Sequence, residues 1–190
     1  MDKLKTYLQA LTPMSDNEFE DSKSNFSRVY LKKGEFFVQQ GRICKQIAFV
    51  NRGSLRTYYF NDKAEEITAC FRTEKSLTSS YKSFILQEPS LLSIVAIEET
   101  ELIVIDYDNL QELYKTSIAW QNIGRLVAER EYINMEQYAS VLNNESAKEK
   151  YLRLIDEQGE ILQKANVEHI ATYLGVTRRT LSRIRQEIAI

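Results

Sequence analysis

The sequence changes character at Asp106, and this change limits the folds that the chain can adopt. Before it, residues 27–106 consist of short β-branched and aromatic runs separated by Lys-Gly, Gln-Gly, Arg-Gly and Asn-Asp turns, which is typical of strands. After it, residues 107–143 contain no proline and only one glycine, and their apolar residues recur at helical spacing. Because no helices alternate with the strands, we expect an α+β fold with a barrel or jelly roll rather than a parallel sheet.

Two segments of the first part predict pairs of strands. QIAFVNRGSLRTYYF has a turn at Asn51–Gly53, and SIVAIEETELIVID has a turn at Glu98–Thr100. Both combine alternating or continuous apolar runs with turn residues between them. We therefore expect strands on either side of each turn.

The helical part predicts one long helix over residues 111–144. A helix of more than 20 residues is about 30 Å long or longer, which exceeds one small β domain. We expect it to pack against a second copy of itself, and a helix lying on its own barrel is the alternative. Asn143–Asn144 breaks the helix and Ser146 can cap the next one, which predicts a hinge at 143–146. The stripe predicted to face the partner is Ile123, Leu126, Val127, Arg130, Ile133, Asn134, Gln137 and Val141.

The segment EHIATYLGVTRRTLSRIR has the spacing of two crossed helices. Gly175 follows the first helix, where a left-handed residue is needed, and Thr177 can cap the second helix. Ala171 is small at the point where the helices would cross. Together these positions predict a helix-turn-helix. The apolar residues predicted to face inward are Ile170, Ala171, Leu174, Leu181 and Ile184.

The outward side of the second helix is basic, although the whole chain has a net charge of −2. Four arginines and no acid lie between Thr177 and Arg185. The N-terminal end of such a helix enters the major groove of DNA, where arginine donates two hydrogen bonds to guanine. A basic, solvated helix in a bundle is the alternative. We expect base contacts from Arg178, Arg179, Ser182 and Arg183, and phosphate contacts from Thr177, Thr180 and Arg185.

Metal, redox and membrane functions have little support in the sequence. Two cysteines, Cys44 and Cys70, and one histidine, His169, cannot build a four-ligand zinc site or an iron–sulfur cluster within one chain. A cupin-like oxygenase is the enzyme alternative, but the strand region has no histidine. We expect no metal, no cofactor and no enzyme activity, and two ordinary half-buried sheet cysteines.

No apolar run approaches the roughly 20 residues of a membrane span. The N-terminus lacks the long apolar core of a secretory signal and predicts a short amphipathic helix. We therefore expect a cytoplasmic protein that does not contact a membrane.

With these residues, the chain resembles the Crp/Fnr family of bacterial transcription regulators over nearly all of its length. LKKGEFFVQQG, IAFVNRGSLRTYY and VAIEETELIVID resemble strands of the family's cyclic-nucleotide-type β-roll, and VEHIATYLGVTRRTLSRIR resembles its DNA-reading motif. The resemblance implies a double-stranded β-helix sensor domain (jelly roll) at 1–110, a dimerisation helix and hinge at 111–144, and a helix-turn-helix domain at 145–190. It also implies a homodimer that binds a double-stranded DNA operator, with RNA polymerase as a further candidate partner.

Two departures from the family pattern change what we expect. Cyclic-nucleotide binders of this fold hold the ribose with a Gly-Glu pair and the phosphate with an arginine that precedes Ser or Thr. Here Ser90 and Leu91 stand at the Arg-Ser/Thr positions, and neither offers the cationic fork that a buried phosphate requires. We therefore do not expect cyclic AMP to bind; the two alternatives are an unidentified small-molecule effector and no effector at all. The residues predicted to line the effector pocket are Arg72, Ser79, Ser80, Tyr81, Lys82 and Ser90.

The second departure lies at the start of the recognition helix. Many relatives have Arg-Glu there, and the glutamate accepts a hydrogen bond from cytosine N4. The pair Arg178–Arg179 replaces that acceptor with a donor, so the preferred half-site should differ. The alternative to a transcription regulator is a ligand-binding signalling module with a vestigial C-terminal domain.

Overall fold

The computed structural model describes residues 1–188, and it describes the side chains of all of them except 138–144. Within this part the strands form two four-stranded sheets of antiparallel pairs. The sheets enclose the main apolar core, which contains Phe49 and Val104 from one sheet and Leu55 and Ile94 from the other. The first sheet has the order β1 (Phe26–Leu31), β8 (Thr100–Asp106), β3 (Gln46–Arg52), β6 (Leu77–Thr78), and the second has the order β2 (Phe36–Val38), β7 (Ser93–Ala96), β4 (Leu55–Phe60), β5 (Glu66–Arg72).

The two predicted turns are present, and each carries the chain from one sheet to the other. β3 pairs with β8 and β6, whereas β4 pairs with β5 and β7, so the turn between β3 and β4 joins the two sheets. Gly53 in this turn has φ +95°, and a Cβ there would lie 2.5 Å from Thr100 Oγ1 in the turn between β7 and β8. The two turns therefore pack together at a point where only glycine fits.

The prediction of strands alone over residues 27–106 is wrong at α3 (Tyr81–Leu86). This short helix is held by tertiary contacts that the local sequence pattern does not reveal. Ser83 Oγ accepts a hydrogen bond from the Cys44 N–H at 2.9 Å, and the Phe84 ring packs edge-on against Tyr107, with their centroids 5.3 Å apart.

The N-terminal segment folds over one end of the β-roll. It contains α1 (Asp2–Leu11), α2 (Asp16–Ser22) and a 3₁₀ turn (Lys23–Asn25). Leu4 and Leu8 on α1 are buried in the main core, as the predicted amphipathic helix requires. No helix in the described part of the chain combines the length and the apolar character that a membrane span needs.

The predicted single helix after Asp106 is divided in two. α4 (Tyr107–Thr116) ends at Ser117, whose backbone is extended, and α5 (Ile118–Asn144) begins directly after it. The Ser117 N–H donates to the Leu113 carbonyl at 2.9 Å, and Ser117 Oγ accepts from the Trp120 N–H at 3.4 Å. One serine thus ends the first helix and caps the second, and Trp120 becomes buried in the core.

The predicted dimerisation stripe on α5 is interrupted because its first part serves the chain's own core. Ile123 is buried in that core, so it is not available to a partner, and Val127 is partly buried against the same core. Farther along the helix, Tyr132 is 66% exposed and Met135 is 68% exposed. Val141 lies outside the residues whose side chains are described.

Four helices follow: α6 (Ala147–Gln158), α7 (Ile161–Lys164), α8 (Val167–Leu174) and α9 (Arg178–Ile188). Ser146 caps α6 as predicted, because its Oγ accepts from the Glu149 N–H and the Glu149 carboxylate accepts from the Ser146 N–H. The predicted hinge at 143–146 begins in residues whose side chains are outside the description.

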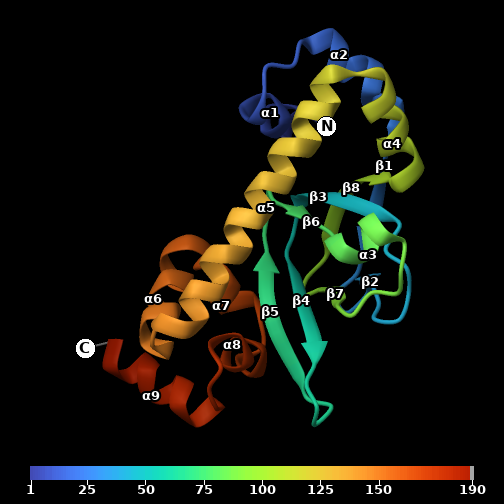
Figure 1. The fold of residues 1–190 in the computed structure, drawn as a ribbon. Coiled ribbons are helices and arrows are strands. Elements are labelled where there is room, and N and C mark those ends of the chain that lie inside the picture. Colours follow the sequence, from blue (N-terminus) through green and yellow to red (C-terminus); the bar gives the residue numbers. More distant parts are fainter. Residues whose placement is uncertain (189–190) are drawn as a thin grey trace.

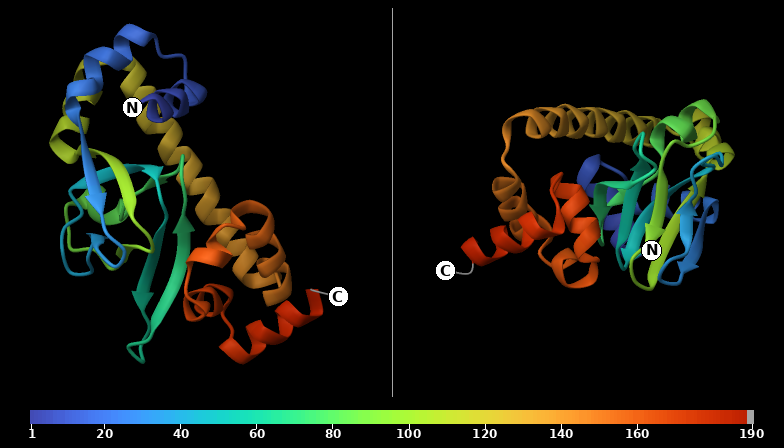
Figure 2. Two further views of the ribbon diagram at one scale, coloured as in Figure 1. Left: turned by 180° about the vertical axis from the view of Figure 1, so that it is seen from behind. Right: turned by 90° about the horizontal axis from the view of Figure 1, so that it is seen from below.

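The long helix connects the β-roll with the C-terminal helices. In the right-hand view of Figure 2, α5 spans the distance between them, and α9 points away from the roll. Figure 1 shows that α8 lies beside β5. The core of the C-terminal helices includes two β-roll residues, Phe71 and Ile97. The C-terminal helices are therefore packed directly against the second sheet.

Candidate nucleic-acid interface and sensor region

α8 and α9 cross about a tight turn at Gly175. This glycine has φ +71°, and its N–H donates to the carbonyls of Ala171 and Thr172 at the end of α8. Ala171 and Leu181 are fully buried where the two helices meet. All five residues predicted to face inward belong to this core: Ile170, Ala171, Leu174, Leu181 and Ile184.

The opposite face of α9 is open to solvent and basic. The side chains of Arg178 and Arg183 are 67% and 73% exposed, and Arg179 and Ser182 are also exposed. Arg178 Nε lies 3.6 Å from the Glu168 carboxylate, and Arg183 Nε lies 3.9 Å from the Glu187 carboxylate. Surface ion pairs of this kind contribute little, so a phosphate or a base edge can replace these carboxylates. Ser182 lies between the arginines on the same face.

The N-terminus of α9 is capped as predicted. Thr177 is exposed, and its Oγ1 accepts a hydrogen bond from the Thr180 N–H at 3.2 Å. The two threonine hydroxyls lie 3.0 Å apart. This end of the helix therefore presents hydroxyl groups and remaining backbone N–H groups, both of which can donate to an anion.

Arg185 has a structural partner that the sequence did not indicate. Its Nε donates to Tyr151 Oη at 3.1 Å, and its guanidinium carbon lies 5.8 Å from the centre of that ring. Tyr151 belongs to α6 and is buried. Arg185, which was predicted to contact a phosphate, thus also holds α9 against α6.

A hydrogen-bonded junction joins α8 to β5. Thr172 Oγ1 accepts from the Thr68 N–H at 3.3 Å and lies 2.9 Å from Thr68 Oγ1. The rings of Phe71 and Tyr173 are 5.6 Å apart, and Lys164 pairs with Glu98 of the β-roll at 2.9 Å. The orientation of the helix pair is therefore fixed by specific contacts with the second sheet.

A cleft of about 1060 Å³ lies next to this junction, between β4–β5 and the start of α9. Arg56 on its sheet side is 2% exposed, donates to the Glu66 carboxylate and to Thr68 Oγ1, and stacks on the Tyr58 ring. His169 faces it from α8, and burial, assisted by Arg56, lowers the pKa of His169. Sequence reasoning missed this arginine because nothing in its strand distinguishes it locally.

The serines predicted for the effector pocket bond to one another and to the backbone. Ser90 Oγ lies 2.7 Å from Ser80 Oγ and accepts from the Leu92 N–H at 3.0 Å, and both serines are buried. Ser79 Oγ donates to the Gln46 carbonyl at 3.1 Å. These hydroxyls stabilise the loops around α3.

The other predicted pocket residues are divided between a small cavity and the surface. Arg72, Ser79 and Tyr81 line a cavity of about 40 Å³, which has room for a few water molecules and is too small for a nucleotide. Arg72 contacts Glu131 of α5 at 3.6 Å. Lys82 is exposed. The structure therefore does not bring the six predicted residues together around one ligand-sized space.

The cysteines and the metal-binding residue types show no cluster. Cys44 and Cys70 are free. Cys70 lies in β5 as expected, whereas Cys44 is buried in the segment before β3. Among the residues that the structure describes, no group of three or more His, Cys, Asp or Glu side chains is placed to hold a metal ion.

Comparison with known proteins identifies the N-terminal domain and the fold. Residues 28–117 match the family model of the cyclic nucleotide-binding domain. No curated protein sequence matches the chain. Among solved structures, the Catabolite Activator Protein of Thermus thermophilus is 19% identical, with 96% of this chain and 86% of that chain covered and a TM-score of 0.62.

Two further regulators have the same arrangement. FixK2 from Bradyrhizobium japonicum is 17% identical, with 86% of this chain and 84% of that chain covered and a TM-score of 0.72. The c-di-GMP responsive global regulator CLP of Xanthomonas campestris is 16% identical, with 92% of each chain covered and a TM-score of 0.68. At these identities the similarity establishes the fold. The chain thus has a cyclic nucleotide-binding β-roll with C-terminal helices, and its structural neighbours include Crp/Fnr transcription regulators.

Proposed function

We propose that this chain, which carries a cyclic nucleotide-binding domain and shares the fold of Crp/Fnr regulators, is a sequence-specific DNA-binding transcription regulator that acts as a homodimer. The observation that carries the proposal is the exposed basic face of α9 on a tightly packed helix pair. A rigid helix with a solvated row of arginines is the form in which proteins read the major groove. The fold of known regulators supports this role and gives no support to an enzyme.

In this proposal α8 and α9 form a helix-turn-helix, and α9 is the recognition helix. Arg178, Arg179 and Arg183 donate to guanine O6 and N7, and the capped N-terminus at Thr177 contacts a phosphate. Arg178 and Arg179 are both hydrogen-bond donors, whereas many relatives have a donor followed by an acceptor at these positions. We therefore expect a half-site that is richer in guanine on the strand that α9 reads.

A second copy of the chain completes the DNA-binding unit. Operators that are read by helix-turn-helix dimers repeat at intervals of one helical turn. The exposed apolar residues Tyr132 and Met135 on α5 are suited to contact the partner, and such contacts would set the spacing of the two α9 helices. RNA polymerase is a further proposed partner once the dimer is on its operator.

The sensor domain of this regulator should not respond to cyclic AMP. The position of the phosphate-binding arginine is occupied by Ser90, which bonds to Ser80 and to the backbone. The cavity beside Arg72 and Ser79 holds only about 40 Å³. Any effector must therefore bind at another place or through different chemistry.

The test is selection of genomic DNA fragments with the purified protein, followed by gel-shift titration of the selected site. Arg178→Ala and Arg183→Ala should each weaken binding about tenfold or more, because a bidentate base contact is worth about 1–3 kcal/mol. Arg42→Ala is the matched control, since Arg42 is an exposed arginine on the β-roll, and it should bind like the parent protein.

Binding should also weaken steeply as salt concentration rises, because phosphate contacts release counterions. Absence of any selected site, or binding that is insensitive to salt and to both substitutions, would contradict DNA reading. That result would favour a signalling module in which the C-terminal helices have another role.

A further inference from the structure

A further cavity, larger than the one beside Arg72, opens between α3, α4 and α5, on the outer side of the β-roll. Its volume is about 570 Å³, which is within the range of small-molecule sites. Of the six residues predicted for the effector pocket, only Tyr81 contributes to it. The residues that give it its character are Tyr81, Phe84, Tyr107, Tyr114, Gln121 and Arg125.

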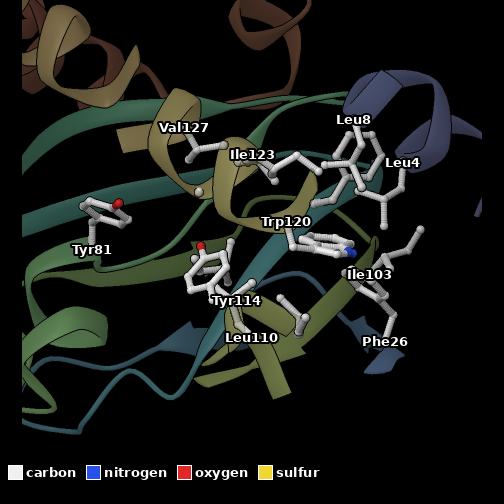
Figure 3. A pocket seen from close by; sticks show the side chains of 15 residues that line it. Leu4, Leu8, Phe26, Tyr81, Ile103, Leu110, Tyr114, Trp120, Ile123 and Val127 are labelled. Atoms are coloured by element: carbon white, nitrogen blue, oxygen red, sulfur yellow. The ribbon is translucent and has the colours of Figure 1, made fainter. Parts of the chain in front are cut away.

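A narrow apolar space of about 50 Å³ lies next to this outer cavity, beneath α5. The two spaces have five lining residues in common, which form the wall between them: Ile47, Tyr81, Leu110, Tyr114 and Gly124. Figure 3 shows Tyr81 and Tyr114 on one side of the inner space and Trp120 between Tyr114 and the α1 residues on the other.

Gly124 allows the Tyr114 ring to pack directly against α5 in the wall between the two spaces. A Cβ at this position would lie 2.5 Å from Tyr114 Oη, so the phenol occupies the space that any other residue's side chain would need. Glycine inside a helix is otherwise unfavourable. Burial raises the pKa of Tyr114 to about 12, and its hydroxyl therefore remains neutral and able to donate a hydrogen bond.

Two polar groups distinguish the inner space and the opening of the outer cavity. Trp120 Nε1 is buried and has no hydrogen-bond partner among the described residues, which is uncommon for a buried donor. At the opening, Arg125 carries a charged group that is half exposed and is paired with Glu129 of its own helix at 2.7 Å. An apolar interior with a cation at the mouth is complementary to a molecule with an apolar body and one negative charge.

We propose that this cavity binds a small aromatic carboxylic acid, with its ring between Tyr81 and Tyr114 and its carboxylate at Arg125. The lining favours an aromatic body over an aliphatic one, because tyrosine, phenylalanine and tryptophan rings offer edge and face contacts to a second ring. The carboxylate replaces Glu129 as the partner of Arg125. The site is independent of the DNA-binding face and remains a prediction even if the chain does not bind DNA.

Trp120 provides a direct measurement, because it is the only tryptophan in the chain. We suggest a titration with 3-phenylpropionate in the absence of DNA. The fluorescence emission of Trp120 is recorded with selective excitation of tryptophan. A saturable change in Trp120 emission is expected. The alcohol 3-phenylpropanol, which has the same body without the charge, should bind about tenfold more weakly, because it cannot form the charge-assisted bond to Arg125.

Two charge variants separate the site from general electrostatics. Arg125→Gln should weaken 3-phenylpropionate binding about tenfold. Lys115→Gln removes the same charge from an exposed side chain of α4 that pairs with Glu112, and it should leave binding unchanged. Equal binding of the acid and the alcohol, equal effects of the two variants, or no saturable change in emission would each overturn the proposal.

A third variant tests the packing of Tyr114 against Gly124. Gly124→Ala should abolish the emission change, because the added methyl group displaces Tyr114 into the cavity. Circular dichroism shows whether this variant is folded. If it is not, the Arg125→Gln result still decides, since that substitution alters a half-exposed side chain at the rim.

Discussion

Arg178 and Arg185 lie on the same helix and carry the same charge, but their surroundings differ. Arg178 projects into solvent with a weak contact to Glu168. Arg185 is hydrogen-bonded to Tyr151 and lies near the face of its ring. The Arg178 side chain is therefore accessible to a ligand, whereas the Arg185 side chain also holds α9 against α6.

This difference predicts separate effects on stability. Arg185→Ala should lower the free energy of unfolding by about 1 kcal/mol, because a side-chain hydrogen bond and a cation–π contact are lost. Urea denaturation measures the change. Arg178→Ala is the control and should leave the midpoint nearly unchanged, and equal midpoints for the two variants would contradict the structural role of Arg185.

The residues of the helix pair were predictable because all of their relations are local. Gly175, Thr177 and the buried positions of α8 and α9 lie within 19 residues of one another, and helical spacing alone assigns their faces. Trp120, Tyr114 and Arg56 gain their roles from distant parts of the chain. No local pattern marks them, so the sequence did not indicate these roles.

The turns between the sheets are the elements on which the β-roll depends most. Strand positions and turns were predicted from alternation and glycine, but the pairing of β3 and β4 with different strands was not, because pairing is a long-range relation. α3 was missed for the same reason, because the residues that hold it, Cys44 and Tyr107, are distant in the sequence. The hydrogen bonds that break the helix at Ser117 are local, but the apolar spacing continues across the break and hides it.

Gly53→Ala tests the contact between the two turns. The added methyl group would meet Thr100 Oγ1 at 2.5 Å and the Glu99 carbonyl at 2.7 Å, in addition to the strain of φ +95°. We expect a loss of about 2 kcal/mol or more in the free energy of unfolding, measured by chemical denaturation.

Gly34→Ala is the matched control for this prediction. Gly34 has φ +88° and no atom within 4 Å of the added Cβ, so it reports the backbone strain alone. A loss at Gly53 no larger than the loss at Gly34 would show that the two turns are not packed together in solution.

In the whole molecule, α5 has two consecutive functions along its length. Its first turns, with Trp120 and Ile123, complete the core of the β-roll, and its later turns expose Tyr132 and Met135. The sequence predicted a single dimerisation helix because apolar spacing does not tell whether a face meets its own domain or a partner. The proposed ligand cavity lies beside the first of these two regions.

Met135→Glu should convert the proposed dimer into a monomer, because a charge placed in an apolar contact must be desolvated. Sedimentation at several protein concentrations measures the mass. Ile118→Glu is the control, since Ile118 is exposed at the other end of the same helix, 17 residues before Met135. A monomeric parent protein, or a dimer that tolerates Met135→Glu, would contradict the predicted interface.

The shared core of the β-roll and the C-terminal helices limits how this protein can be recombined. Phe71 and Ile97 are packed among the residues of the helix pair, and Thr68 is hydrogen-bonded to Thr172. A C-terminal segment transplanted from another protein of this fold would meet a β5 surface shaped for different side chains. A chimera that keeps these contacts therefore has to exchange the outer face of β5 together with α6–α9, so the exchanged segment must be larger than the helix pair proposed to contact DNA.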